Sequence, residues 1–334
     1  MALALALLAA WSLTVGAYPV TLQEAWQAML NRLQAVTGDI AGLPGDGHAA
    51  TVDTVLFGIR LPRIGAGIAI GACLAAAGAS YQAVFRNPLV SPDILGVSAG
   101  AGFGAVLGIF LSLPAAGIQL LAFSGGMAAV GLVVLIAASM RGRESVLTLI
   151  LGGVVVGALA GACTSLLKVL ADPYDQLPAI TFWLLGSLAA VNGSDFRSVL
   201  PLAALGLPPL IALRWRIGVL SLDDDEAQAL GVPVRSTRLL VIGCATLVTS
   251  SVVAISGAIG WVGLVIPHIA RMLVGPSFSR VLPASAFLGA AYLLLVDTLA
   301  RSMSDNEIPL GILTAVVGAP FFLWLLARGR RGWI

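Results

Sequence analysis

The residue types that most often support catalysis or metal binding are few and scattered in this chain. The two histidines, His48 and His268, lie too far apart to form a zinc-binding HExxH pair. Cys73, Cys163 and Cys244 are isolated, each inside an apolar segment, and fit neither a disulfide framework nor a paired metal site. No GxxxxGK[ST] motif is present, so ATP is not bound through a P-loop. The sequence therefore predicts no catalytic site, no metal site and no cofactor held by this chain.

One carboxylate lies inside an apolar segment, where it could take part in proton transfer. Asp297 is the only acidic residue well inside a long apolar segment, and intramembrane carboxylates are candidates for proton relays. Arg301 follows at i+4, which is the spacing of an ion pair within one helix. We therefore favour a structural pair near a membrane edge over proton coupling. An ion-driven secondary transporter would have Asp297 as its only support, and a membrane enzyme would need converging polar residues that the sequence lacks.

Residues 221–234 form the one strongly polar internal segment. Ser221 or Asp223 could cap a short helix whose acidic first turn favours the helix dipole. Gly231 would end that helix, and Pro233 would prevent it from resuming. From the residues alone, the segment is either a solvated connector or a docking surface for a cytoplasmic partner.

The elements that must position these residues are apolar helices. The 334-residue chain is 59% hydrophobic and only 10% charged, whereas soluble domains carry about 25% charged residues. A membrane span needs about 20 apolar residues, so the sequence predicts an all-α integral membrane protein. We expect ten spans, at 2–17, 62–83, 93–111, 117–139, 146–168, 196–213, 237–256, 258–273, 281–300 and 309–327.

Two further apolar segments need separate interpretation. The piece 177–190 follows Asp172 and Asp175 and is predicted to be a half-length helix outside or partly within the membrane. The first run could instead be a signal peptide, but it has no basic segment before it, which favours a retained span.

The arginines indicate how the spans are oriented. With a cytoplasmic N-terminus, twelve of the 18 basic residues fall in inner loops or at the inner C-terminus: Arg86, Arg141, Arg143, Arg214, Arg216, Arg235, Arg238, Arg271, Arg280, Arg328, Arg330 and Arg331. The positive-inside rule thus favours ten spans with both ends inside. Segments 18–57 and 171–192 are then outside, and 221–234 is inside.

Glycines predict how the spans pack. They recur at every fourth position in two segments, as Gly96, Gly100, Gly104 and Gly108, and as Gly153, Gly157 and Gly161. On a helix this spacing makes a groove along one face, where a neighbouring backbone can approach closely. We expect a tightly packed helical bundle.

Taken together, these motifs resemble the permease subunits of bacterial iron-complex and vitamin B12 ABC importers. The similar segments are RLPR at 60–63, NPL at 87–89, GVSAG at 96–100, EAQALG at 226–231, GAIGWVGLVIPHIAR at 257–271, and IPLG through GAPFF at 308–322. They follow the family's order and cover most of the chain.

The resemblance implies one permease domain over 1–334, working as a homodimer in the bacterial inner membrane. Spans 2–5 and 7–10 would be related as an inverted repeat. Two cytoplasmic ATPase subunits would bind ATP and Mg²⁺, and a periplasmic binding protein would deliver substrate; the chain would contact membrane lipid and no nucleic acid. The segment 221–234 would be the coupling helix, through Asp223, Asp224, Asp225, Glu226, Ala227, Leu230 and Gly231.

The resemblance also assigns residues at the outer surface and along the path. Arg60, Arg63 and Arg301 match positions that dock the binding protein; membrane-edge anchoring is the alternative. The path would be lined by the fifth span and the half-helix after it. Its inner gate would lie at Ser145, Val146, Leu147 and Thr148.

The predicted gate bears on the cargo. The vitamin B12 importer has small hydroxyl residues there, whereas here Val146 and Leu147 take those places, or the alignment is shifted by one residue. The resemblance therefore favours a ferric siderophore or haem, with cobalamin as the alternative and an oxyanion still open. No high-affinity substrate site is expected in this chain, because selectivity would lie in the binding protein.

Overall fold

The structure is a computed structural model that describes all residues except 17, 38–46, 141–144, 305 and 330–334. Within the described residues every regular element is helical. The elements are α1 (Ala2–Thr14), α2 (Leu22–Thr37), α3 (Gly47–Asp53), a π-helical turn (Thr54–Arg60), α4 (Leu61–Val84), a 3₁₀ turn (Pro92–Leu95), α5 (Val97–Phe110), α6 (Ala115–Ser139), α7 (Ser145–Leu170), α8 (Gln176–Leu185), α9 (Gly193–Ala212), α10 (Arg214–Val219), α11 (Asp224–Ala229), α12 (Val234–Ser256), α13 (Val262–Val274), α14 (Phe278–Ala300) and α15 (Leu310–Gly329).

The helices agree in place with the predicted spans but not always in length. Among the described residues, six helices are long and apolar enough to cross a membrane: the one over Gly47–Val84, then α6, α7, α9, α12 and α14. The apolar parts of α1, α5, α8, α13 and α15 are shorter. All-helical membrane architecture is therefore confirmed, while the count of ten spans and the inverted repeat stay predictions.

The second predicted span is longer than expected. α3, the π-helical turn and α4 run on as one helix of 38 residues, Gly47–Val84. At 1.5 Å per residue that helix is about 57 Å long, well beyond the roughly 30 Å of a hydrocarbon core. The end of the predicted outer segment 18–57 is thus a continuation of the span.

α4 is the central helix of the bundle, and nearly every residue in its second half is buried. A Cβ atom added at Gly71 would lie 2.2 Å from the carbonyl oxygen of Gly289 in α14. One added at Gly78 would lie 1.9 Å from that of Gly263 in α13. Glycine is needed at both crossings because any side chain would push the backbones apart.

The glycines expected to form grooves differ in their surroundings. On α5, a Cβ at Gly100 would lie 2.4 Å from the Gly125 oxygen, and one at Gly104 would lie 2.0 Å from the Leu121 oxygen, both in α6. Gly108 approaches Ile118 of α6 less closely, with a Cβ to Cα distance of 3.0 Å. The α5–α6 seam is therefore a close backbone contact along most of its length.

The second glycine series makes close contact at only one position. A Cβ at Gly153 of α7 would lie 2.1 Å from the Ile94 oxygen, one at Gly157 would be in ordinary contact at 3.9 Å, and Gly161 has nothing within 4 Å. Gly96 has another role: with φ +80° it ends the 3₁₀ turn and starts α5. A single groove along α7 is thus not what these glycines form.

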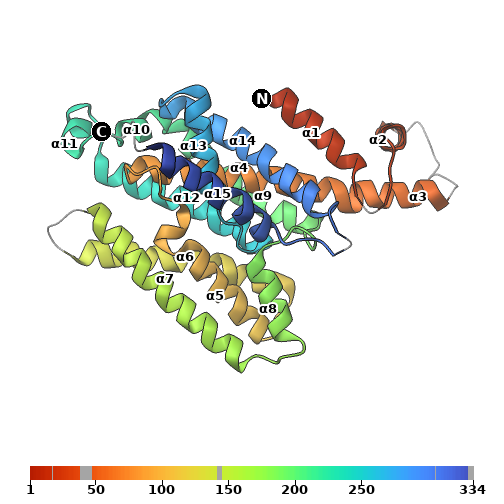
Figure 1. Cartoon of the computed structure of the whole chain (residues 1–334), viewed down its shortest axis with the longest axis horizontal. Coiled ribbons are helices and arrows are strands. Elements are labelled where there is room, and N and C mark those ends of the chain that lie inside the picture. Colours follow the sequence, from red (N-terminus) through yellow and green to blue (C-terminus); the bar gives the residue numbers. More distant parts are fainter. Residues whose placement is uncertain (17, 38–46, 141–144, 305, 330–334) are drawn as a thin grey trace.

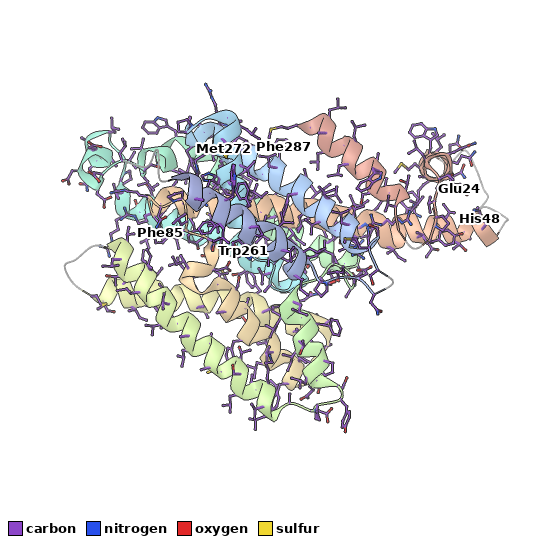
Figure 2. The ribbon with its side chains drawn as sticks, viewed as in Figure 1. Glu24, His48, Phe85, Trp261, Met272 and Phe287 are labelled. Atoms are coloured by element: carbon purple, nitrogen blue, oxygen red, sulfur yellow. The ribbon has the colours of Figure 1, made fainter. Side chains whose placement is uncertain are left out.

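The helices form two groups, and the bundle has two distinct ends. α5–α8 lie on one side, while α4 and α12–α15 lie on the other, with α1 along α14 (Figure 1). α10 and α11 lie at one end, and α2 and α3 at the opposite end (Figure 1). Figure 2 shows Glu24 and His48 at the second of these and Phe85, where α4 ends, toward the first. We call them the α11 end and the α3 end.

Candidate functional sites at the two ends of the bundle

The predicted coupling helix is present as α11. Asp223 is its N-cap residue, but its side chain does not cap the helix. It pairs instead with Arg86, 3.0 Å from Asp223 Oδ1 to Arg86 Nη1. Gly231, with φ +79°, follows the end of the helix, and its N–H donates to the Gln228 carbonyl at 2.8 Å. The expected boundaries are correct, and the expected side-chain cap is wrong.

α11 has an inner face and an outer face. Ala227 is fully buried, and Asp224 on the same face is partly covered. Asp225, Glu226 and Leu230 are exposed, and Leu230 is 54% exposed although it is apolar. The seven residues predicted for ATPase coupling therefore divide: some face the bundle, and the others present a small acidic and apolar surface.

Asp224 is held by two arginines from two helices. Arg238 of α12 donates from Nη2 to Asp224 Oδ1 at 2.9 Å, and Arg86, after the end of α4, donates to the same oxygen. Partial burial would raise the pKa of Asp224, but the hydrogen bonds and charges of Arg238 and Arg86 outweigh it and leave the pKa below its ordinary value. Asp224 is therefore ionised at neutral pH.

The predicted gate lies beside this ion-pair cluster. Val146, in the first turn of α7, lines a cavity of about 460 Å³ together with Phe85, Arg86, Asp223, Asp224, Asp225 and Arg238. Leu147 is 51% exposed, and Thr148 is partly buried. Ser145 begins α7, but its side chain lies outside the described part. The start of α7 and the start of α11, predicted to be the gate and the coupling helix, thus line one cavity.

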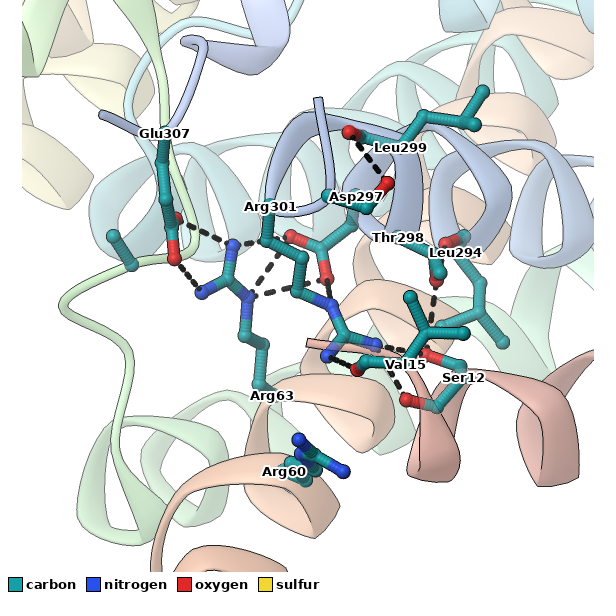
Figure 3. A network of polar contacts seen from close by, with 12 residues as sticks. Ser12, Val15, Arg60, Arg63, Leu294, Asp297, Thr298, Leu299, Arg301 and Glu307 are labelled. Atoms are coloured by element: carbon teal, nitrogen blue, oxygen red, sulfur yellow. Dashed lines mark hydrogen bonds and ion pairs between the residues drawn. The ribbon is translucent and has the colours of Figure 1, made fainter. Parts of the chain in front are cut away.

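A second ion-pair cluster lies toward the α3 end (Figure 3). Arg63 of α4 binds both oxygens of Asp297 in α14, at 2.8 Å from Nη2 to Oδ1 and 3.1 Å from Nε to Oδ2. Its two Nη atoms also bind Glu307 at 2.7 and 2.8 Å. The predicted pair of Asp297 with Arg301 exists but is longer, at 3.7 Å. Asp297 is 1% exposed, and its main partner is Arg63 from a distant helix.

Arg60 and Arg301 close the C-terminal end of α1. Arg301 donates to the carbonyl oxygens of Ser12, at 2.5 Å, and Val15, and Arg60 donates to the carbonyl oxygens near the same end at Leu13 and Tyr18. The last carbonyls of a helix lack partners within it and carry a partial negative charge. The two guanidinium groups supply both the hydrogen bonds and the opposite charge.

These contacts show that the three arginines predicted to dock a binding protein also have partners within the chain. Arg60 and Arg63 are only 5% and 7% exposed, and all three arginines donate to acceptors inside the chain. They line an open cavity of about 880 Å³ with Glu307 and Tyr18. Docking of a binding protein stays a prediction, and it would require contact through that cavity.

A separate pair of contacts joins α2 to α3. His48 Nε2 lies 2.9 Å from Glu24 Oε1, and its Nδ1 lies 3.0 Å from the hydroxyl of Tyr18. The His48 hydrogen bond, helped by the Thr21 N–H, lowers the pKa of Glu24 to about 2. Among the described residues, no three His, Cys, Asp or Glu side chains gather where they could hold a metal ion.

The sequence identified most of the charged residues at the two sites but not the residues with which they form ion pairs. Arg86 and Arg238 were predicted only as inner-loop basic residues, and Glu307 was not predicted at all. A weak signal existed for Arg86, because it lies in the polar break between two apolar segments. No local pattern pointed to Arg238 or Glu307.

Known proteins similar to this chain share a common role. The FecCD transport family matches residues 4–328. The molybdate import permease MolB of Haemophilus influenzae is 40% identical, covering 99% of this chain and 95% of its own. The Fe(3+) dicitrate permease FecD of Escherichia coli is 39% identical, covering 98% and 97%. The cobalamin import permease BtuC of Halobacterium salinarum is 39% identical, covering 94% and 91%.

One solved structure agrees with the whole fold. It is the inward-facing conformation of a transporter described as metal-chelate type, with a TM-score of 0.85 and 39% identity, covering 98% of this chain and 97% of the other. The family match, the relatives and the helical membrane fold all lead to one assignment. This chain belongs to the FecCD transport family of ABC importers and is a membrane permease subunit, not an enzyme.

Proposed function

We propose that this chain moves an iron complex, a ferric siderophore or haem, into the cell by ATP-driven alternating access. It would act as a homodimer with two ATPase subunits at the α11 end and a binding protein at the α3 end. Both termini would then be cytoplasmic. The observation that carries this proposal is the cavity that the start of α7 and the ion-paired start of α11 line together.

The surface of α11 supports an ATPase partner. Leu222 and Leu230 are 41% and 54% exposed and flank the acidic residues Asp225 and Glu226. An apolar contact with a charged rim is typical of a protein–protein interface. A movement of this face would change the cavity that α11 and Val146 line together.

The exposed side of α7 supports a second copy across the path. Leu151, Val154, Val155 and Leu159 are 57–64% exposed. In a homodimer this face would lie along the shared axis instead of facing lipid. It would there line a wide channel that interacts weakly with the substrate. Such a channel suits a bulky cargo, since tight binding would slow its release.

The cargo is proposed from the relatives and the gate. FecD carries Fe(3+) dicitrate by its name, and the solved neighbour is of metal-chelate type. Cobalamin is the second candidate because a 39% identical relative is a cobalamin permease, and another relative, MolB, is named a molybdate permease. Val146 and Leu147 give the gate an apolar character, which we take to favour iron complexes over cobalamin.

An ion-coupled transporter has less support than an ABC importer. A carboxylate that carries protons must exchange them with water, but Asp297 is 1% exposed and bound by Arg63. Its contacts fit a structural role.

Reconstitution in proteoliposomes tests the proposal. The chain, its cognate ATPase and its binding protein would be offered a ferric siderophore, haem, cobalamin and molybdate in separate assays. We expect ATP-dependent uptake of a ferric complex or haem. Uptake of cobalamin or molybdate alone would reject the iron assignment, and uptake driven by an ion gradient without ATP would reject the importer.

A further inference from the structure

The ion pairs of α11 lie on the side of the helix that faces the bundle, away from the exposed face proposed to bind the ATPase. Asp224 is the first residue of α11, yet its partners lie in α12 and in the turn that follows α4. Arg238 lies in the second turn of α12, and Arg86 follows the C-terminus of α4. One carboxylate therefore ties α11 to two transmembrane helices at once.

Both arginines are fixed at their own positions. The side chain of Arg238 is only 7% exposed, so it cannot move freely away from the bundle. Arg86 has φ +50°, a conformation that a residue with a side chain keeps only where its surroundings hold it. Its guanidinium also donates to the carbonyl oxygen of Leu220 at 3.1 Å, so it is anchored to the segment that leads into α11.

The two helices joined in this way are themselves coupled in the core. The hydroxyl of Tyr81 in α4 lies 2.8 Å from that of Thr246 in α12, and both residues are buried. Arg271 of α13 donates to the amide oxygen of Gln82, so α4 is also bound to α13. A displacement of α11 transmitted to Arg86 and Arg238 would therefore move a rigid group of helices.

The neighbouring acidic residue has a different environment. Asp225 is exposed, and within the described part of the chain it forms no ion pair. Asp224 and Asp225 thus offer the same chemistry in adjacent positions, one attached to the bundle and one facing outward.

We propose that Asp224 is a positioning residue that transmits movement of α11 to α4 and α12, so that its ion pairs, rather than the docking surface itself, link ATP use to opening of the path. This inference rests on the proposed importer function. It predicts that breaking the pairs leaves the ATPase bound but uncouples it. Loss of an exposed residue on the outer face should instead weaken ATPase binding.

The test compares Asp224→Asn with Asp225→Asn in the full complex with ATPase and binding protein. For Asp224→Asn we expect wild-type co-purification of the ATPase and wild-type basal hydrolysis. We also expect an about three- to tenfold loss of binding-protein-stimulated hydrolysis and of uptake per ATP. A loss of about three- to tenfold is the size expected when one charge-assisted hydrogen bond of a partly exposed carboxylate is removed. Asp225→Asn, on the outer face, should weaken co-purification of the ATPase, but in the complexes that do form it should leave stimulated hydrolysis and uptake per ATP within about twofold of wild type.

Two more variants keep the test decisive. Asp224→Glu retains the carboxylate and should therefore keep most of the coupling. If Asp224→Asn acted instead by disturbing the packing of the helix, Asp224→Glu would lose coupling as well. Arg86→Gln removes one of the two links at a less buried side chain and should reproduce the uncoupling even if Asp224→Asn folds poorly. Equal coupling in Asp224→Asn and Asp225→Asn would overturn the inference. Failure of the wild-type chain to bind any ATPase would instead overturn the proposed function.

Discussion

The contact between α5 and α6 allows a sharp prediction about one methyl group. Gly104→Ala places a Cβ atom 2.0 Å from the carbonyl oxygen of Leu121, about 1.4 Å short of ordinary contact near 3.4 Å. The two backbones would have to separate by a similar amount. Gly131→Ala in α6 is the matched control, because that position is exposed and has nothing within 4 Å.

The two substitutions should change the free energy of unfolding in opposite directions. Alanine in place of a helical glycine stabilises by about 0.5–1 kcal/mol where space is free, so Gly131→Ala should be neutral or stabilising. At Gly104 the same gain is opposed by overpacking, which costs about 1–3 kcal/mol or more. If the methyl group separates α5 and α6 by even 0.5–1 Å, each dispersion contact between them loses about a quarter to a half of its energy. Because the glycine-to-alanine gain is common to both positions, the two variants should differ by the overpacking cost, roughly 1–3 kcal/mol or more.

Thermal unfolding in detergent measures this difference. Cys73 is a free, buried cysteine, so in a chain whose partly exposed Cys163 and Cys244 are replaced by serine a thiol-reactive fluorescent reagent reports when the bundle opens. We expect Gly104→Ala to melt several degrees below wild type and Gly131→Ala at or above it. A Gly104→Ala protein that melts as high as Gly131→Ala would refute the close backbone contact and the packing argument built on it.

Two further predictions concern ionised groups. Arg63→Gln should lower the free energy of unfolding by about 3–5 kcal/mol because it leaves buried Asp297 without its main partner, whereas Arg32→Gln, in an exposed pair, should cost at most about 1 kcal/mol; similar melting temperatures for the two would contradict the buried cluster. Because hydrogen bonds from His48 and Thr21 lower the pKa of Glu24, the stabilisation they give its carboxylate is fully present above the ordinary value of 4.5 and is lost as the pH falls toward 2. A ¹³C titration of the Glu24 carboxyl should therefore have its midpoint near 2, and His48→Gln should move it up toward 4.5; an unchanged midpoint would disprove the contact.

The fold was more predictable than the contacts of the candidate sites. Helix positions follow from apolar runs, because a chain in a bilayer must satisfy its own backbone hydrogen bonds. α11 was also predictable, since acidic residues, Gly231 and Pro233 mark its two ends within a dozen residues. The glycine pattern indicated close packing, but spacing alone did not separate Gly104, against a backbone, from Gly161, in open space.

The sequence by itself determined the membrane class, the helices, the family resemblance and the position of the short polar helix α11, because each depends on residues close together in the chain. Only the tertiary structure decided what the charged residues do. Arg63 meets Asp297 across 234 positions, and Arg86 meets Asp224 across 138. The physical reason is that an ion pair depends on separations of about 3 Å, and these are set by which helices pack together and at what depth. Arginines expected to face outward for docking are thus bound to the chain's own carboxylates and helix end.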